Sequence, residues 1–171
     1  MFDKSEACCF SGYRPEKFNL PQDHTAAMLA PELETAVRHA VQDGYRLFVT
    51  GMSRGFDLWA AQTVLRLRQE MPVKLLCAIP FDRQSQGWEP EWQTLYHEIL
   101  LNADFVQSLS HKYTPDCFFI RNRFMIEGCS RLICWYDGCP GGTRFTVQCA
   151  KRRGLELVNL ADRQLCLFHT G

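Results

Sequence analysis

The sequence lacks a long apolar run and an excess of charge of either sign. No stretch approaches the roughly 20 consecutive apolar residues that a membrane-spanning helix needs, and residues 1–6 lack the basic and apolar regions of a signal peptide. Lysine plus arginine equals aspartate plus glutamate at 19 each, so no overall charge draws the chain toward nucleic acid or anionic lipid. We therefore expect a cytoplasmic protein without membrane contact, in which any recognition by charge is local.

A metal-binding pattern is lacking as well. Nine cysteines would suggest disulfides in a small secreted protein, but the number is odd and most lie in apolar runs such as Leu76-Cys77-Ala78. Cys129, Cys134 and Cys139 recur every five residues, yet no C-x-x-C or histidine pair completes a zinc site. We expect reduced core cysteines, no metal site and no required cofactor.

Strands and helices alternate along a chain of 171 residues, of which 46% are hydrophobic, as expected for one globular domain. Apolar runs predict strands over residues 7–10, 46–50, 73–79, 103–109, 132–136 and 155–160. Helical spacing and capping residues predict helices from the turn containing Pro31 to Gly44, and over 56–69, 91–101, 115–128 and 144–153. The alternation predicts the α/β class: one Rossmann-like domain over residues 1–171, with an open, mostly parallel sheet of about six strands and helices on both faces.

The segment T-G-M-S-R-G-F-D at residues 50–57 is the most informative loop of the predicted fold, because it follows a strand and enters a helix. Gly51 and Gly55 can take positive φ and let a ligand approach the backbone closely. Ser53 and Arg54 add a hydroxyl group and positive charge beside the helix N-terminus. We interpret the segment as a phosphate-binding loop, and an ordinary tight βα turn is the alternative.

Other loops at the carboxyl ends of the predicted strands carry similar residues. Ligands of open parallel sheets bind beyond these ends, where the strand order reverses. The loops after the first, second, fourth and fifth strands therefore predict one anion-binding crevice. Its candidate residues are Gly12, Arg14, Gly51, Ser53, Arg54, Gly55, Thr114, Gly141, Gly142 and Thr143.

Three more residues near this edge each have two interpretations. Arg121 lies within a helix but leans toward the edge, so it either binds the anion or forms a surface ion pair. Asp57 either favours the positive end of its helix or holds a ribose hydroxyl group. Trp88 either belongs to a packing stripe with Trp92 and Tyr96, or stacks on a nucleotide base.

Several segments in order along nearly the whole chain resemble the YpsA-like family of the SLOG superfamily. They are Ser11-Gly12-Tyr13-Arg14-Pro15, similar to T-G-H-R-P; residues 50–57, similar to T-G-G-A-R-G-V-D; Phe81 with Gln84 and Trp88; Arg121-Asn122-Arg123-Phe124-Met125; and Asp137-Gly138 with Gly141-Gly142-Thr143. The superfamily comprises Rossmann-like folds and includes the DNA-uptake protein DprA/SMF and the LOG phosphoribohydrolases. The resemblance implies a nucleotide or nucleotide-derived ligand, similar to ADP-ribose or NAD, with Asn122 and Asp137 among the site residues.

The chain departs from these relatives at two positions. Tyr13 replaces the histidine of the opening motif. LOG enzymes carry a catalytic glutamate shortly after their P-G-G-x-G-T turn, whereas Thr143 is followed by Arg144-Phe145-Thr146-Val147-Gln148. The missing carboxylate argues against glycosidic cleavage by that mechanism. The fingerprint G-x-G-x-x-G is absent too, which argues against a nicotinamide oxidoreductase.

Three functional hypotheses result. The first is a protein that binds or senses a phosphorylated nucleoside ligand, with charge from Arg14, Arg54 and Arg121. The second is a nucleotide N-glycosidase, whose catalytic residues are unknown and whose general acid would come from Asp57, Asp82, Asp116 or Asp137. The third is single-stranded DNA binding as in DprA, which zero net charge disfavours. Dimers are frequent in the superfamily, so a homodimer stays open.

Overall fold

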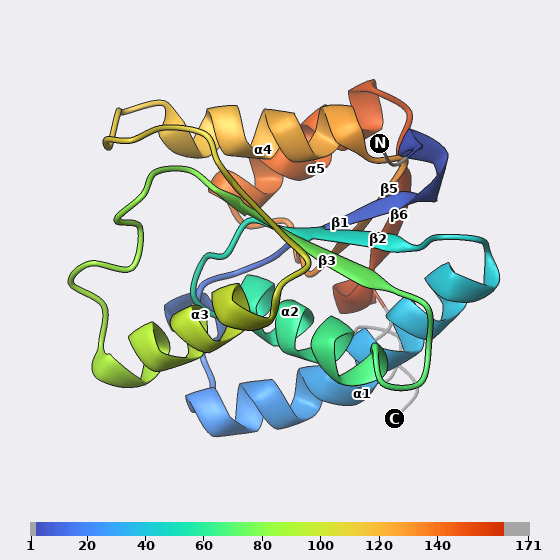
Figure 1. Cartoon of the computed structure of the whole chain (residues 1–171), viewed down its shortest axis with the longest axis horizontal. Coiled ribbons are helices and arrows are strands. Elements are labelled where there is room, and N and C mark those ends of the chain that lie inside the picture. Colours follow the sequence, from blue (N-terminus) through green and yellow to red (C-terminus); the bar gives the residue numbers. More distant parts are fainter. Residues whose placement is uncertain (1–2, 163–171) are drawn as a thin grey trace.

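The computed structural model describes residues 3–162, which form a six-stranded parallel sheet between two layers of helices (Figure 1). The strands are β1 (Ala7–Ser11), β2 (Leu47–Thr50), β3 (Lys74–Ile79), β4 (Phe105–Ser108), β5 (Arg131–Cys134) and β6 (Glu156–Asn159). The helices are α1 (Gln22–Gln42), α2 (Phe56–Leu67), α3 (Pro90–Asn102), α4 (Cys117–Gly128) and α5 (Gly142–Arg152), with short 3₁₀ turns η1 (Lys4–Glu6) and η2 (Pro15–Phe18). The predicted α/β class and three-layer architecture are confirmed.

The strand order across the sheet is β4-β3-β2-β1-β5-β6. The chain moves outward from β1 to β4, and then returns to the other side of β1 with β5. The order therefore reverses between β1 and β5, where the loops that follow these two strands diverge. In open parallel sheets this divergence creates a crevice at the carboxyl ends of the strands.

Helices α1, α2 and α3 cover one face of the sheet, and α4 and α5 cover the other (Figure 1). The side chains of β1 alternate between the two faces, and all five residues are buried. Cys8 and Phe10 belong to the core under α1 to α3, whereas Ala7 and Cys9 belong to the core under α4 and α5. Burial on both faces explains the continuous apolar runs of the central strands.

Helix α1 begins at Gln22, nine residues before the predicted start at Pro31, so that prediction was wrong. Pro31 lies inside the helix, where its missing N–H removes the bond to the carbonyl group of Ala27. The helix persists because its buried face extends upstream through Thr25 and Leu29. Burial of this face outweighs the loss of one hydrogen bond.

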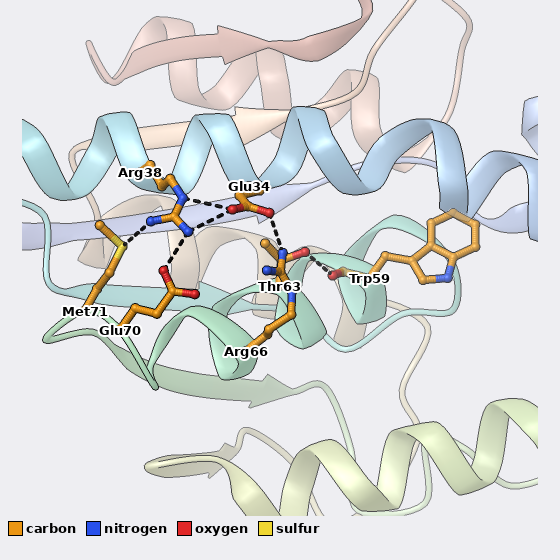
Figure 2. Close-up of polar contacts among 7 residues, drawn as sticks. All are labelled: Glu34, Arg38, Trp59, Thr63, Arg66, Glu70 and Met71. Atoms are coloured by element: carbon orange, nitrogen blue, oxygen red, sulfur yellow. Dashed lines mark hydrogen bonds and ion pairs between the residues drawn. The ribbon is translucent and has the colours of Figure 1, made fainter.

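A network of ion pairs joins the middle of α1 to the end of α2 (Figure 2). Arg38 binds Glu34 and Glu70 at 2.8 Å each, and Arg66 binds Glu34 at 2.8 Å. These side chains are partly exposed, so water screens their attraction and each pair contributes little to stability. The network links the partly exposed faces of α1 and α2, and none of its residues lines the pocket at the β1–β5 crevice.

Disulfides, metal-binding groups and helices able to span a membrane are all absent from the described residues. None of the eight cysteines within residues 3–162 forms a disulfide, and six of them are buried. In the same residues, no group of three or more histidine, cysteine or acidic side chains is arranged to hold a metal ion. No helix among them is both long and apolar enough to span a bilayer.

Candidate functional site

A pocket of about 420 Å³ lies at the point where the strand order reverses, and we call it the switch-point pocket. Its walls come from the loop after β1, the loop after β2, the first half of α4 and the first turn of α5. Nine of the predicted site residues line it: Gly12, Arg14, Ser53, Asp57, Arg121, Asn122, Gly141, Gly142 and Thr143. A larger hollow of about 620 Å³ lies between α1, α2 and α3 and contains no predicted site residue.

The β1 loop approaches the start of α2 so closely that position 12 has no room for a side chain. A Cβ atom on Gly12 would lie 2.6 Å from the Cβ atom of Phe56, whose ring is fully buried. The Phe56 N–H donates to the carbonyl oxygen of Tyr13 at 3.2 Å. These contacts join the first two predicted loops into one wall of the pocket.

Arg121 forms a buried part of the pocket floor, not a surface ion pair. Its guanidinium donates to the Gly51 carbonyl oxygen, to Asn122 Oδ1 at 2.7 Å and to Ser53 Oγ at 3.5 Å. Burial lowers the pKa of Arg121, and the nearby Asp57 carboxylate opposes this effect. Arg121 therefore places α4 against the β2 loop and keeps positive charge beneath the pocket.

Gly51 is a glycine for a different reason than the sequence suggested. A Cβ atom at this position would lie 2.6 Å from Arg121 Nη1, so a side chain would displace the guanidinium. Gly51 does not adopt the positive φ that glycine can take; the next residue, Met52, has it instead, with φ 61°. Gly55 has the predicted positive φ, 86°, and forms the turn into α2 behind the pocket.

Asp57 is a buried carboxylate in the pocket lining, only 5% exposed. Its Oδ2 accepts a hydrogen bond from the Ser53 N–H at 3.3 Å, and Oδ1 has no hydrogen-bond partner within the described residues. Burial raises the pKa of Asp57 to about 6, although the positive charges of Arg121 and Arg14 and the N–H groups of Ser53 and Gly12 act in the opposite direction. The carboxylate is thus an under-used hydrogen-bond acceptor.

The N-terminus of α5 supplies hydrogen-bond donors to the same pocket. Gly141 precedes the helix and no side chain caps it. The first N–H groups of a helix have no acceptor within the helix, and they carry its positive dipole end. Lys17 adds charge here, because its Nζ donates to the Pro140 carbonyl oxygen at 2.6 Å. This end of the pocket favours an anion.

An aromatic and cationic wall closes the pocket on the α4 side. Two guanidinium groups lie near the Phe118 ring, with Arg14 Cζ at 5.6 Å and Arg121 Cζ at 5.7 Å from its centroid. Phe119 is half exposed and packs edge-on against Phe145 of α5, at 4.7 Å between centroids. The wall therefore presents both apolar surface and positive charge to a ligand.

Other predicted residues lie outside the pocket lining. Arg54 occupies a separate hollow of about 280 Å³, where it pairs with Glu16 at 2.7 Å and Glu89 at 3.3 Å. Trp88 packs against Tyr96 with centroids 5.3 Å apart, as the packing interpretation predicted. The structure therefore does not bring Arg54 and Trp88 to the same pocket as Gly12 and Thr143.

Three of the four nominated carboxylates, Asp82, Asp116 and Asp137, also lie outside the lining. Asp137 accepts hydrogen bonds from the Tyr13 hydroxyl and, at 3.1 Å, from the Cys139 N–H. Burial alone would raise the pKa of Asp137, but these hydrogen bonds lower it overall. Asp82 contacts His111 at 2.9 Å, and Asp116 accepts from the Thr114 hydroxyl at 2.8 Å. Asp57 is therefore the one nominated general acid that lines the switch-point pocket.

Comparisons with known proteins agree with this architecture. The profile of the YspA SLOG family (YpsA) matches residues 8–157. The chain belongs to this family. It is 32% identical over 150 residues to a UPF0398 protein of Bacillus thuringiensis (strain Al Hakam), an alignment that covers 84% of this chain and 82% of the relative.

Two solved structures similar to this SLOG-family chain are DNA processing proteins A. The protein from Streptococcus pneumoniae superposes with a TM-score of 0.64 at 17% identity over 90% of this chain, which spans about half (50%) of that protein. The protein from Helicobacter pylori, whose structure is described for single-stranded DNA binding, superposes with a TM-score of 0.58 at 18% identity over 95% of this chain and 72% of the other. At these identities the likeness concerns the fold.

Sequence reasoning missed several lining residues of this SLOG-family pocket: Ser11, Tyr13, Glu16, Lys17, Phe118 and Phe119. Lys17 follows the glycine-containing β1 loop, but only the 3₁₀ turn η2 brings its ammonium group 2.6 Å from the Pro140 oxygen. Phe118 lies three residues before Arg121 and so on the same face of α4, which was an available signal. Phe119 lies two residues before Arg121, and its spacing gave no such signal.

Proposed function

We propose that the switch-point pocket binds a nucleotide or nucleotide-derived phosphorylated ligand of the ADP-ribose or NAD type. One observation carries the proposal: a single pocket joins the uncapped N-terminus of α5 to the buried carboxylate of Asp57. A phosphate group requires N–H donors and positive charge, and a sugar requires acceptors for its hydroxyl groups. The pocket offers both, because its lining includes the start of α5 and Asp57.

The phosphate belongs at the α5 end in this proposal. The N–H groups of Gly142 and Thr143 begin the helix, and Arg14 and Lys17 line the same pocket. Hydrogen bonds from backbone N–H groups and from arginine to phosphate are short and strong, because one partner is charged. The Asp57 carboxylate would repel the phosphate, so the phosphate lies away from it.

The pocket size and the family support a nucleotide. A volume of about 420 Å³ is within the range of small-molecule sites. The YspA SLOG family has the Rossmann-like architecture, in which nucleotides bind at the reversal of the strand order. Phe118 and Phe119 add the apolar wall that a base or ribose needs.

Isothermal titration calorimetry with ADP-ribose, NAD, AMP and orthophosphate tests the proposal. Replacement of the pocket arginine, Arg14→Met, should weaken the affinity for the best ligand about 10- to 100-fold, the size of a lost charge-assisted hydrogen bond. The matched control is Arg123→Met, an exposed arginine of α4 outside the pocket. No binding below millimolar concentration, or equal affinity in the two variants, would contradict the proposal.

A second candidate function, N-glycosidase activity, is favoured by the environment of Asp57. A carboxyl group with a pKa of about 6 is well placed to donate a proton near neutral pH. In the reaction, Asp57 would give its proton to the leaving base as the glycosidic bond breaks. Water would add to the sugar carbon and return a proton to the Asp57 carboxylate, which gives ribose 5-phosphate and free base. Incubation with nucleoside monophosphates, followed by chromatography for free base, tests this candidate, and the absence of free base would remove it.

The structure of the Helicobacter pylori protein is described for single-stranded DNA binding. For this chain, single-stranded DNA binding is a weaker candidate function. The chain has zero formal net charge, so DNA binding would depend on the local charge of Arg14 and Lys17. A gel shift with single-stranded oligonucleotides at low salt tests it directly.

A further inference from the structure

We propose that Asp57 accepts a hydrogen bond from a sugar hydroxyl group and thereby makes the switch-point pocket selective for ribose over deoxyribose. This inference rests on the proposed nucleotide function and names its specificity-determining residue. It also separates the chain from proteins whose ligand is DNA.

The first argument is the unfilled hydrogen-bonding capacity of Asp57. An ionised carboxylate has about four acceptor positions. Asp57 uses one of them for the Ser53 N–H, at a long 3.3 Å, and Oδ1 has no partner in residues 3–162. The Gly12 N–H also acts on the carboxylate and lowers its pKa, but it is not within hydrogen-bonding geometry of Oδ1. A carboxylate that is 95% buried is costly to leave in this state, because water cannot replace the missing donors freely.

The second argument is that the donors of Arg121 and Thr50, two side chains next to Asp57, are directed at other acceptors, and that no described side chain donates to Asp57 Oδ1. The Arg121 guanidinium donates to Gly51, Asn122 and Ser53. The Thr50 hydroxyl donates to the backbone carbonyl oxygen of Asp57 itself, at 3.0 Å. The missing donor is therefore expected from a molecule in the pocket that Asp57 lines.

The third argument concerns the kind of donor. A phosphate has no place beside the carboxylate, since both are negative. A cationic donor would approach Arg14 and Arg121, whose positive charges already act on Asp57. A neutral hydroxyl group donates without adding charge, and a nucleotide with phosphate at the α5 end carries its ribose hydroxyl groups close by. The geometry favours a hydroxyl of the ribose.

Selectivity follows from the cost of an unpaired buried charge. A ligand without the hydroxyl would occlude the pocket and leave Asp57 without its donor. Sites built to bind a hydroxyl group reject the analogue that lacks it far more strongly than apolar sites reject a missing methylene. We expect AMP to bind about 10- to 100-fold more tightly than the deoxy analogue that lacks the contacted hydroxyl.

Calorimetry with AMP, 2′-deoxy-AMP and 3′-deoxy-AMP at pH 7.5 tests the inference on the wild-type chain and on Asp57→Asn. The wild type should discriminate against one of the deoxy analogues, and Asp57→Asn should lose most of this discrimination. The control Asp116→Asn alters an exposed carboxylate outside the pocket and should keep the wild-type ratio. Equal affinity of the wild type for the three ligands would overturn the inference and leave the proposed function intact, whereas no binding of any of them would overturn both.

A second measurement does not depend on the folding of Asp57→Asn. In the wild type, the ratio of the AMP and deoxy-AMP affinities should fall several-fold between pH 7.5 and pH 5, because protonation removes the negative charge of the Asp57 acceptor. The groups that face Asp57 are Arg14 and Arg121, which stay charged, and the N–H groups of Gly12 and Ser53. Titration of the phosphate cancels in the ratio, since all three ligands carry it. A ratio independent of pH would contradict a role for Asp57.

Discussion

The raised pKa of Asp57 predicts an unusual dependence of stability on pH. Most native carboxylates have lowered pKa values and stabilise the fold as the pH rises. Asp57 does the opposite, because burial raises its pKa from 3.8 to about 6. The native state binds a proton at Asp57 more tightly than the unfolded state does. Acidification from pH 7.5 toward pH 5 should therefore stabilise the native state through this group.

The magnitude follows from the two pKa values. Each unit of pH below the native pKa contributes about 1.4 kcal/mol until the unfolded pKa is reached. At pH 5, one unit below the native value, the Asp57 contribution to the free energy of unfolding should be about 1.4 kcal/mol larger than at pH 7.5. The complete effect, near 3 kcal/mol, would require a pH below 3.8.

The window of pH 5 to 7.5 keeps other acids out of the measurement. Hydrogen bonds from Arg66 and Arg38 lower the pKa of Glu34, and hydrogen bonds from Ser108 and His111 lower that of Asp82. Stability from such groups is present above their unfolded pKa values and is lost only at more acidic pH. Asp57 therefore dominates the difference between the wild type and Asp57→Asn in this window.

Urea denaturation, followed by circular dichroism, measures the free energy of unfolding of the wild type and Asp57→Asn at several pH values. Asp57→Asn removes the titrating carboxyl group, so the part of the pH dependence that comes from Asp57 is absent in the variant. Any loss of stability from changed packing or hydrogen bonding of the uncharged amide is the same at every pH in this window. The test is thus the difference between the two slopes, about 1.4 kcal/mol from pH 7.5 to pH 5. Parallel curves for the two proteins would refute the reasoning.

Two further predictions concern one residue in the pocket wall and two residues outside it. Gly12→Ala should lower the free energy of unfolding by about 1–3 kcal/mol, because its Cβ would overlap the buried Phe56, and Phe56→Leu in the same chain should recover part of the loss. The control Gly128→Ala has open space at the end of α4 and should be neutral or stabilising by up to about 1 kcal/mol in the same denaturation assay. Arg54→Ala and Trp88→Leu should change the affinity for the best nucleotide less than Arg14→Met does, because neither side chain lines the pocket. Calorimetry measures the three affinities. A larger loss in Arg54→Ala or Trp88→Leu would place the ligand in the hollow around Arg54 instead.

Local patterns sufficed for the fold class and for most of the site loops. Burial on both faces of a parallel sheet leaves continuous apolar runs, and the loops after β1, β2, β3 and β5 contain glycine. Both features can be recognised from consecutive residues of the sequence. Nine predicted site residues share one pocket because the carboxyl ends of parallel strands meet at one edge. The start of α1 was missed because a proline usually marks a helix end or first turn, whereas the apolar face through Leu29 carries the helix past it.

Only the tertiary structure decided which side chains share a pocket, and what hydrogen bonds and charges surround each of them. Arg54 and Ser53 are adjacent in the chain, yet Arg54 turns to Glu16 and Glu89 while Ser53 faces Arg121 from α4. Asp57 looks like an ordinary first-turn acid in the sequence, and its unfilled hydrogen-bonding capacity depends on groups from three other segments. The sequence determined the layers and the edge at which a ligand would bind, because these depend on periodicity and turns between neighbouring residues. Distances between residues far apart in the chain decide the electrostatics of Asp57 and Arg121, and only packing of the whole domain sets those distances.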